Sequence, residues 1–415
     1  MIITPPGRTW AEIDLDNIAH NYGEFRRITG NNVKIMCVVK ANACEHGAAA
    51  VAKRLEKEGC GTFGVATLDE GLELRRAGIA SYILLLNHVP TGRIGEALGN
   101  NLAMTVFSKE MAKLISDSAS TANPQPPAAN PQPSAATPQP ETVKSTAPPP
   151  AKIHIKIDTG MTRIGFNPED AAEAAKYISA LPKIEVEGVY THFSCADEYG
   201  TAYTEMQIGR FNEACAEIEA AGVPIKIKHA SNSAAAIMYP QAHFDMVRVG
   251  ISLYGCYPSE EVDKSRVALK PAKQLKSQIV RINEAGPGVS VSYGGKFTTE
   301  RESRLATIPV GYADGVSRVL SGKLMVLVNG QEAPVVGRIC MDQCVADVTD
   351  VAGDVKVSDE VVIYGRQKGA SIPVERIAGQ MGTINYEMLC MTARRVPRYY
   401  MENGEIIAMV NYLDP

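Results

Sequence analysis

The first two thirds of the chain alternate short apolar runs with amphipathic stretches. Eight runs are rich in Val and Ile and are bounded by glycine or polar residues: Lys34–Lys40, Thr62–Ala66, Tyr82–Leu86, Leu102–Val106, Lys152–Asp158, Glu185–Tyr190, Ile225–His229 and Met246–Gly250. Such runs suit strands buried on both faces, as in a parallel sheet. Helical patterns such as Asp69–Ala77 and Thr201–Ala221 lie between them. The alternation predicts an α/β fold, and the count of eight favours a (β/α)8 TIM barrel over an open doubly wound sheet.

After about Glu261 strand-like runs follow one another without long helices, at Leu275–Ile282, Arg304–Val310, Leu324–Val328, Val335–Ile339, Val345–Val348 and Glu360–Tyr364. Asn329-Gly330 and Asn403-Gly404 predict tight hairpins. The pattern predicts a mainly β C-terminal domain. We therefore expect a short N-terminal segment at 1–10 that packs with the β domain, a barrel over 11–262, and the β domain over 263–415.

One segment, residues 118–150, fits neither domain. It holds ten of the 25 prolines and the imperfect repeat NPQPPAA, NPQPSAA, TPQP. Because proline denies a segment both helix and sheet hydrogen bonds, we expect a disordered or polyproline-like insertion. Its place between the fourth helix and the fifth strand predicts that it leaves the barrel at the face opposite catalysis.

Composition narrows the classes of partner. The 415 residues are 45% hydrophobic with a net charge of −4, which does not suggest nucleic acid or an anionic membrane as partner. No apolar run approaches the roughly 18 residues of a membrane helix, and Met1–Trp10 lacks the apolar core of a secretory signal. Nine scattered cysteines without zinc-like spacing indicate free thiols, no metal site and a cytoplasmic location.

Candidate chemistry lies where the predicted strands end, because active sites of such barrels form there. The residues are Lys40, Arg163, His192, Asn232, Ser233, Arg248, Gly250 and Ile251. A lone strand-end lysine such as Lys40 most often reaches solvent, but an amine held by an apolar strand is also suited to form a Schiff base. Likewise, Ser233, Gly250 and Ile251 suit a phosphate site, although a helix cap and a tight turn explain Ser233 and Gly250 equally well.

Eight segments together resemble the alanine racemase family, a family of pyridoxal-phosphate-dependent enzymes. They are VVKANACEHG (38–47), KIDTGMTRIGF (156–166), THFSCAD (191–197), HASNSAA (229–235), RVGISLYG (248–255), VSYGGKF (291–297), IPVGYADG (308–315) and GRICMDQ (337–343). They follow the family's order and spacing and span essentially the whole chain except 118–150. Eight ordered motifs make the resemblance specific, whereas no single motif would.

The resemblance implies that Lys40 binds pyridoxal 5'-phosphate and that the enzyme interconverts L- and D-alanine through an external aldimine, supplying D-alanine for peptidoglycan. Two bases would act on opposite faces of the substrate carbon, Lys40 on the D-side and Tyr293 on the L-side. Arg248 would contact the pyridine nitrogen. Because arginine cannot give up its proton at working pH, the ring nitrogen would stay unprotonated, which suppresses transamination.

The resemblance also implies roles around the cofactor. His192 would link Arg248 to Tyr293, and Arg163 would contact the cofactor's phenolic oxygen and the substrate carboxylate. Lys156 matches a lysine that is carbamylated in some members. The phosphate would bind to Asn232, Ser233, Gly250, Ile251 and Tyr386.

Substrate binding is implied for Met341, through its backbone N–H, with Asp342 beside it and Tyr312 near the substrate entrance. In this family the β domain of one subunit completes the barrel site of the other. The resemblance thus implies a homodimer in which Tyr293, Tyr312, Met341 and Asp342 act in trans.

The chain departs from the family motif at Cys44 and Glu45, where tyrosine and glycine are usual. That tyrosine normally donates a hydrogen bond to the phosphate, and a thiol is a weak donor. Three alternatives remain: a racemase of serine or broader specificity, a non-catalytic pyridoxal-phosphate-binding barrel protein, and a basic-amino-acid decarboxylase. The β domain with Tyr293 favours an enzyme over the second, and Arg248 disfavours the third, which uses an acidic residue at the ring nitrogen.

Overall fold

The computed structural model describes residues 8–121, 149–200 and 202–414, and within these ranges eight parallel strands form a barrel. In chain order they are β2 (Lys34–Val38), β3 (Thr62–Val65), β4 (Tyr82–Leu85), β5 (Ala103–Val106), β6 (Ala151–Lys156), β7 (Ile184–Tyr190), β8 (Ile227–His229) and β9 (Met246–Val249). Strand β9 pairs with β2. The barrel closes where the amides of Asp245 and Arg248 donate to the carbonyls of Lys228 and Ser231. Each strand overlaps a predicted apolar run, and the predicted barrel is confirmed.

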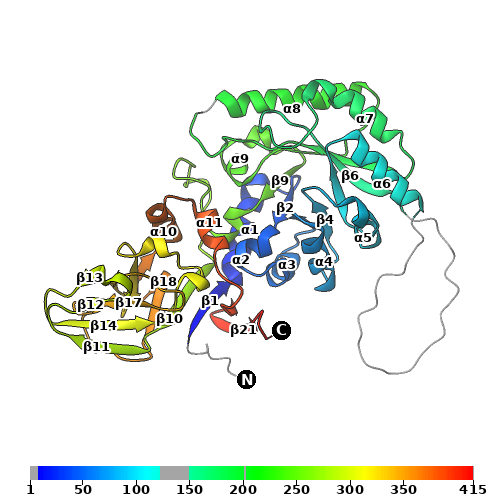
Figure 1. Ribbon diagram of the computed structural model, residues 1–415. Helices are drawn as coiled ribbons and strands as arrows, with labels where there is room; N and C mark the ends of the chain where they lie inside the picture. The colour runs from blue at the N-terminus through cyan, green and yellow to red at the C-terminus, as the bar shows by residue number, and fades with distance from the viewer. Residues whose placement is uncertain (1–7, 122–148, 201, 415) are drawn as a thin grey trace, which may run out of the picture.

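Helices cover the outside of the barrel (Figure 1). They are α1 (Leu15–Thr29), α3 (Ala48–Lys57), α4 (Leu68–Arg76), α5 (Ile94–Gly99), α6 (Lys109–Thr121), α7 (Ala171–Ser179), α8 (Ala202–Ala220) and the short α9 (Ser233–Met238). Helix α4 shows why such stretches are helical. Thr67 and Glu70 form a capping box at its start, which satisfies two free backbone amides. Its buried positions Leu68, Gly71 and Leu74 recur every three residues and face the sheet.

The remaining strands form a mainly β domain to one side of the barrel (Figure 1), as predicted. They are β1 (Thr9–Asp14), β10 (Lys273–Gln278), β11 (Arg281–Ala285), β12 (Ser290–Val291), β13 (Phe297–Thr298), β14 (Ser303–Ile308), β15 (Met325–Val328), β16 (Gln331–Val336), β17 (Cys344–Asp347), β18 (Glu360–Gln367), β19 (Ala370–Ile372), β20 (Arg398–Glu402) and β21 (Glu405–Val410). Strand β1 lies in this sheet, antiparallel to β10 and parallel to β20. The chain therefore contributes β1 to the β domain before it forms the barrel, and it returns to this domain afterwards.

Two details of the β domain test the sequence patterns. Both Asn-Gly turns are tight hairpins, because Asn329 and Gly330 have φ of 54° and 76° and Asn403 and Gly404 have φ of 51° and 76°. The expected single strand Leu275–Ile282 is wrong, since the chain there forms β10 and β11. Strand β10 pairs with β18 and β1, whereas β11 pairs with β14, so the break moves the chain to another part of the sheet.

Helix α6 continues through Thr121, four residues into the segment expected to be an insertion. Ala119 is 3% exposed, so this last turn packs against the barrel. Strand β6 begins at Ala151. Residues 122–148, and with them most of the predicted insertion, lie outside the described residues.

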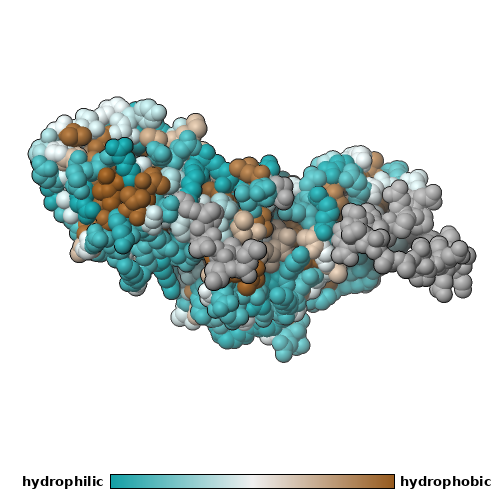
Figure 2. Space-filling model, turned by 90° about the horizontal axis from the view of Figure 1, so that it is seen from below, coloured by the Kyte–Doolittle hydropathy of each residue, from teal (hydrophilic) through white to brown (hydrophobic). Residues whose placement is uncertain are grey.

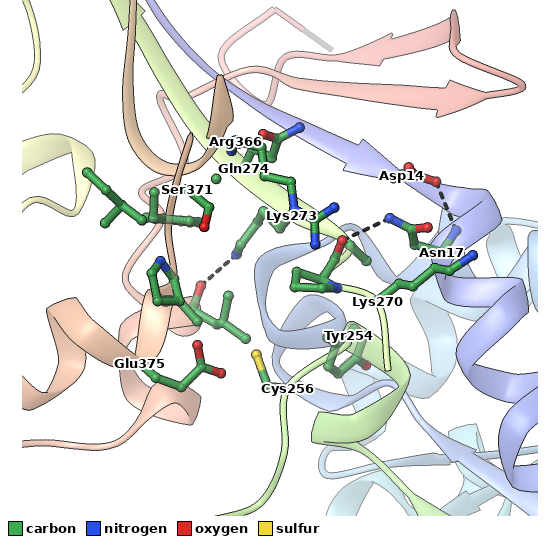
Figure 3. A pocket seen from close by; sticks show the side chains of 18 residues that line it. Asp14, Asn17, Tyr254, Cys256, Lys270, Lys273, Gln274, Arg366, Ser371 and Glu375 are labelled. Atoms are coloured by element: carbon green, nitrogen blue, oxygen red, sulfur yellow. Dashed lines mark hydrogen bonds between the residues drawn. The ribbon is translucent and has the colours of Figure 1, made fainter. Parts of the chain in front are cut away.

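Hydrogen bonds join the two domains within one chain (Figure 3). Lys273 of β10 is buried and donates to the carbonyl oxygens of Leu389, at 2.7 Å, and Cys44, at 3.1 Å. On the barrel side, the Asn17 amide donates to the Pro271 carbonyl at 2.9 Å. Lys273 thereby ties the β domain to the turn that follows barrel strand β2, where the candidate site begins.

Candidate active site

A cavity of about 360 Å³ opens at the carboxyl end of the barrel, a volume within the range of small-molecule sites. Strand ends and the loops after them supply most of its lining. It brings together these residues singled out in the sequence: Lys40, Cys44, Lys156, Arg163, His192, Asn232, Ser233, Arg248, Gly250, Ile251 and Tyr386. Tyr386 comes from α11 (Asn385–Cys390) of the β domain, so one chain alone joins both domains at this cavity.

Lys40 opens α2 (Lys40–Glu45), a left-handed turn directly after β2. Residues 41–45 all have φ between 49° and 60°, a region that L-residues other than glycine rarely adopt. Neighbouring groups hold the turn. The Ala41 amide donates to Glu70 at 2.7 Å, and the Asn42 side chain accepts from the Ala48 amide at 2.8 Å and donates to the Tyr412 hydroxyl at 2.9 Å. The lysine is therefore displayed by a rigid support at the mouth of the barrel.

Arg248 of β9 is buried on the cavity wall, at 4% exposure. Its guanidinium donates to the carbonyls of Thr191, at 2.8 Å, and Ala230, at 2.7 Å, and to ring nitrogens of His229 and His192. Burial lowers the pKa of Arg248 to about 10, so it stays charged at neutral pH. Burial, followed by the charge of Arg248, holds the pKa of His192 well below its usual value. The cavity thus presents a fixed cation beside a neutral imidazole.

The described residues that line this cavity include four basic side chains, from Lys40, Lys156, Arg163 and Arg248, and no acidic one. Lys156 is 3% exposed and donates to the Ile157 carbonyl at 2.7 Å. Burial and the charges of Arg248 and Arg163 lower its pKa to about 7. Such an excess of positive charge suits an anionic ligand.

The residues expected to bind the phosphate lie together at one place on the cavity wall. Asn232 caps α9 by accepting from the Ala235 amide at 2.9 Å, and the Ser233 hydroxyl accepts from the Gly250 amide at 3.0 Å. The helix cap expected at Ser233 is therefore made by Asn232 instead, while Ser233 binds the Gly250 amide. These contacts are compatible with ligand binding, because Ser233 and Ile251 also line the cavity.

Cys44 and Glu45, the two departures from the family motif, point in different directions. Cys44 lines the cavity, and its thiol shares a hydrogen bond with that of Cys390, which, together with burial, raises the pKa of Cys44. Glu45 instead pairs with the fully buried Arg398 at 2.6 Å. A carboxylate that pointed inward would repel a bound phosphate, but the Glu45 carboxylate is held by Arg398.

Four predicted site residues of the β domain, Tyr293, Tyr312, Met341 and Asp342, are not part of the cavity lining of their own chain. The backbone amide of Tyr312 donates to the Cys340 carbonyl at 3.1 Å, which joins two of their loops. Asp342 pairs with Arg395 at 2.7 Å. Their side chains are exposed: Tyr293 is 70%, Met341 52% and Tyr312 41% exposed. A single chain therefore carries two separate groups of site residues.

Sequence reasoning missed Tyr190 and Asn87, which also line the cavity. Tyr190 ends β7, stacks on His229 with ring centroids 4.6 Å apart, and contacts the Arg248 guanidinium with its face. Asn87 follows β4 closely. Both stand at strand ends, so the rule that found Lys40 also applies to them. Within the described ranges, no group of His, Cys, Asp and Glu could hold a metal ion.

A parallel barrel with a lysine after its first strand, a buried arginine on its last strand and a β domain beyond it defines the class of barrel-type amino-acid racemases. A family model described as the alanine racemase N-terminal domain matches residues 13–258. The model of the alanine racemase C-terminal domain matches residues 272–400. The chain belongs to the alanine racemase family, as the sequence motifs indicated.

Individual relatives agree with this assignment. The chain is 44% identical over 405 residues to the alanine racemase of Clostridium novyi, which covers 97% of this chain and 98% of the relative. The solved alanine racemase of Clostridium difficile 630 is 42% identical, with a TM-score of 0.88 over 99% of this chain and 100% of that one. The alanine racemase from Bacillus anthracis, solved with bound L-Ala-P, is 35% identical with a TM-score of 0.86 over 99% of this chain and 100% of that one.

Proposed function

We propose that this chain is a pyridoxal-phosphate-dependent enzyme that interconverts L- and D-alanine in the cytoplasm, supplying D-alanine for peptidoglycan. The observation that carries the proposal is that Lys40 and Arg248 line the same cavity, whose described lining has basic but no acidic side chains. A carboxylate at the ring nitrogen would suit a decarboxylase instead. Among the described residues, no helix is long and apolar enough to cross a membrane.

The cavity fits pyridoxal 5'-phosphate in the chemistry of its donors. Lys40 supplies the amine that would hold an aldehyde, and Ser233, Ile251 and Tyr386 supply donors for a phosphate. Arg248 is positioned to donate to a ring nitrogen without surrendering a proton. When bound, the cofactor withdraws electrons from the substrate and acidifies its Cα–H. Arg163 would hold the phenolic oxygen and the substrate carboxylate.

Proton transfer would use two bases on opposite faces of the substrate carbon. Lys40 would remove or return the proton on the D-side and Tyr293 on the L-side. Since Arg248 can only donate, the Nδ1 of His192, 3.2 Å away, must accept from it. The proton of His192 then resides on Nε2, which would donate to the Tyr293 oxygen and stabilise its deprotonated form.

For Tyr293 to reach the cavity, a second copy of the chain would have to supply it. We therefore propose a homodimer in which Tyr293, Tyr312, Met341 and Asp342 of one chain complete the barrel site of the other. Their exposure in the single chain supports this arrangement. Figure 2 shows hydrophobic surface gathered on the β-domain end of the molecule, which suits burial in an interface.

The division of labour follows the expected domains, with 11–262 as the cofactor-binding barrel and 263–415 as the β domain; of the expected N-terminal segment 1–10, residues 1–7 lie outside the described residues. The pairing of β1 with β10 and β20 supports placing Thr9–Asp14 with the β domain. By this proposal, the backbone N–H of Met341 binds the substrate carboxylate of the partner site, with Asp342 beside it.

The direct test incubates the purified protein with pyridoxal phosphate and either enantiomer of alanine, and measures the opposite enantiomer by chiral chromatography. We expect both directions to run, and Lys40→Ala to lose both activity and the visible absorption of the bound cofactor. Lys53→Ala, on helix α3, is the matched control. Normal racemisation by Lys40→Ala would refute the assignment, and turnover of serine but not alanine would replace the substrate.

A further inference from the structure

A chain of hydrogen bonds crosses the barrel interior from Arg248 toward the end opposite the cavity. Arg248 Nη1 lies 3.0 Å from His229 Nδ1, and His229 Nε2 lies 2.9 Å from His154 Nδ1. His154 Nε2 in turn lies 2.9 Å from the Tyr82 hydroxyl. These residues come from β9, β8, β6 and β4, and both imidazoles are fully buried. The contacts therefore link separate strands through the barrel core.

The chemistry of arginine fixes the direction of this chain. Because the Arg248 guanidinium only donates, His229 Nδ1 must accept, and its proton resides on Nε2. His229 then donates to His154 Nδ1, so His154 also carries its proton on Nε2 and donates to Tyr82. Burial lowers the pKa of His154 to about 3 and that of His229 below its usual value, which agrees with two neutral rings.

Tyr82 accepts from His154 and so must give its own proton to another group. Glu187 of β7 lines the same hollow as Tyr82 and His154, and its charge contributes, after burial, to raising the pKa of Tyr82. The Glu187 Oε2 atom is buried and has no hydrogen-bond partner among the described residues, while Lys152 Nζ lies 3.3 Å from the other oxygen. A buried carboxylate oxygen without a partner therefore lies at the hollow that Tyr82 lines, where it can accept the Tyr82 proton.

The backbone is shaped to make room for this arrangement. The pairing of β6 with β7 shifts between Ile153 and His154, so that Val186 and Gly188 face consecutive residues and Glu187 is the extra one. Such a bulge re-aims a side chain. Gly188 also leaves space, because a Cβ there would lie 2.4 Å from His154 Nδ1. Neither feature is needed for an ordinary barrel strand.

We propose that Glu187 and Tyr82 are positioning residues for Arg248, acting from the opposite end of the barrel. They accept the protons of the relay Arg248–His229–His154–Tyr82–Glu187 and thereby keep His229 Nδ1 free to receive the guanidinium. The expected change in turnover rests on the proposed function. The expected change in the histidine tautomers does not depend on activity. If the acceptor is removed, the imidazoles can turn to the opposite tautomer, and His229 Nδ1–H would then oppose Arg248.

The test uses the full-length protein and ¹⁵N NMR of the imidazoles, which distinguishes the two tautomers. In the wild type we expect both His154 and His229 to carry the proton on Nε2. Tyr82→Phe keeps the ring and removes the acceptor, so it should populate the opposite tautomer and lower kcat about 5- to 100-fold, the factor of one lost buried hydrogen bond, with KM for alanine changed less than kcat. Glu187→Leu should act similarly, whereas Glu187→Gln keeps an acceptor oxygen and should preserve the tautomers.

Matched controls separate this role from general packing. Tyr177→Phe, at an exposed tyrosine on α7, and Glu185→Gln, two residues before Glu187, should leave tautomers and kcat unchanged. Unchanged tautomers and kcat in both Tyr82→Phe and Glu187→Leu would overturn the proposal. If the wild type fails to racemise alanine, the proposed function fails, but the tautomer measurement on the same protein still decides the relay.

Discussion

Replacing Cys44 by tyrosine should tighten binding of pyridoxal phosphate. Cys44 lines the cavity, but its thiol is a weak donor and is already engaged with Cys390. A tyrosine hydroxyl at this position would add a hydrogen bond to the charged phosphate. Such a bond contributes about 1.5–3 kcal/mol, which corresponds to roughly 10- to 150-fold in affinity.

Backbone strain should not offset this gain. Cys44 has φ of 49°, and because cysteine already carries a Cβ, tyrosine adds little strain at the same backbone angles. Glu45 should be left in place. It pairs with the buried Arg398, so Glu45→Gly would remove that partner and lower the stability of the protein without acting on the cofactor.

Equilibrium dialysis of the cofactor-free protein against pyridoxal phosphate measures the dissociation constant. Cys44→Phe is the matched control, because it adds the ring without the hydroxyl. We expect Cys44→Tyr to bind more tightly than both Cys44→Phe and the wild type. Equal constants for the tyrosine and phenylalanine variants would refute the reasoning, since the gain could then not come from the hydroxyl.

Three further predictions concern protons. Lys156, with its pKa lowered to about 7, should react with CO₂ increasingly from pH 6 to 8, because only the neutral amine is nucleophilic; a ¹³C carbamate signal from labelled bicarbonate should grow over this range and be lost in Lys156→Arg, and its absence at pH 8 would count against the prediction. The pKa of His154, about 3, lies below the unfolded value of about 6.5, so the unfolded chain takes up the proton first and the protein should lose about 2 kcal/mol of stability as the pH is lowered from 7 to 5. Urea unfolding should show this loss at the lower pH. His154→Gln should make the stability depend less on pH, and an unchanged dependence would contradict the prediction. Tyr293→Phe should slow the exchange of the Cα proton of L-alanine for deuterium in heavy water, while exchange from D-alanine continues through Lys40. The reverse pattern would show that the two bases are assigned to the wrong faces.

The parts of the site that could be predicted are those that topology determines. Parallel strands buried on both faces give continuous apolar runs, so the runs ending near Lys40 and Arg248 marked strands, and the carboxyl ends of such strands meet at one place. Tyr190 and Asn87 were accessible to the same rule. The hairpins at Asn329 and Asn403 were predictable because their φ values favour Asn and Gly.

Other features depend on contacts that periodicity does not encode. The split between β10 and β11 reflects a change of pairing partners, and the place of β1 in the C-terminal sheet joins residues far apart in sequence. The left-handed turn at 41–45 contains alanine and cysteine, which have no preference for positive φ. It is held by Glu70 and Tyr412 from elsewhere in the chain, so local sequence gave no sign of it.

The relay shows a further limit of strand patterns and modifies a general expectation about barrels. His154 lies within the run Lys152–Asp158, where it breaks no hydrophobic pattern strongly enough to be noticed. The amino-terminal face of such barrels is ordinarily assigned to stability and the carboxyl face to catalysis. Here hydrogen bonds run from Arg248 through the core to Tyr82, and each link is directional because arginine can only donate. With Glu187 as the proposed acceptor of the Tyr82 proton, a charge at the stability face would be coupled to Arg248 at the catalytic face, so substitutions far from the cavity should alter turnover through the protonation sites of buried histidines.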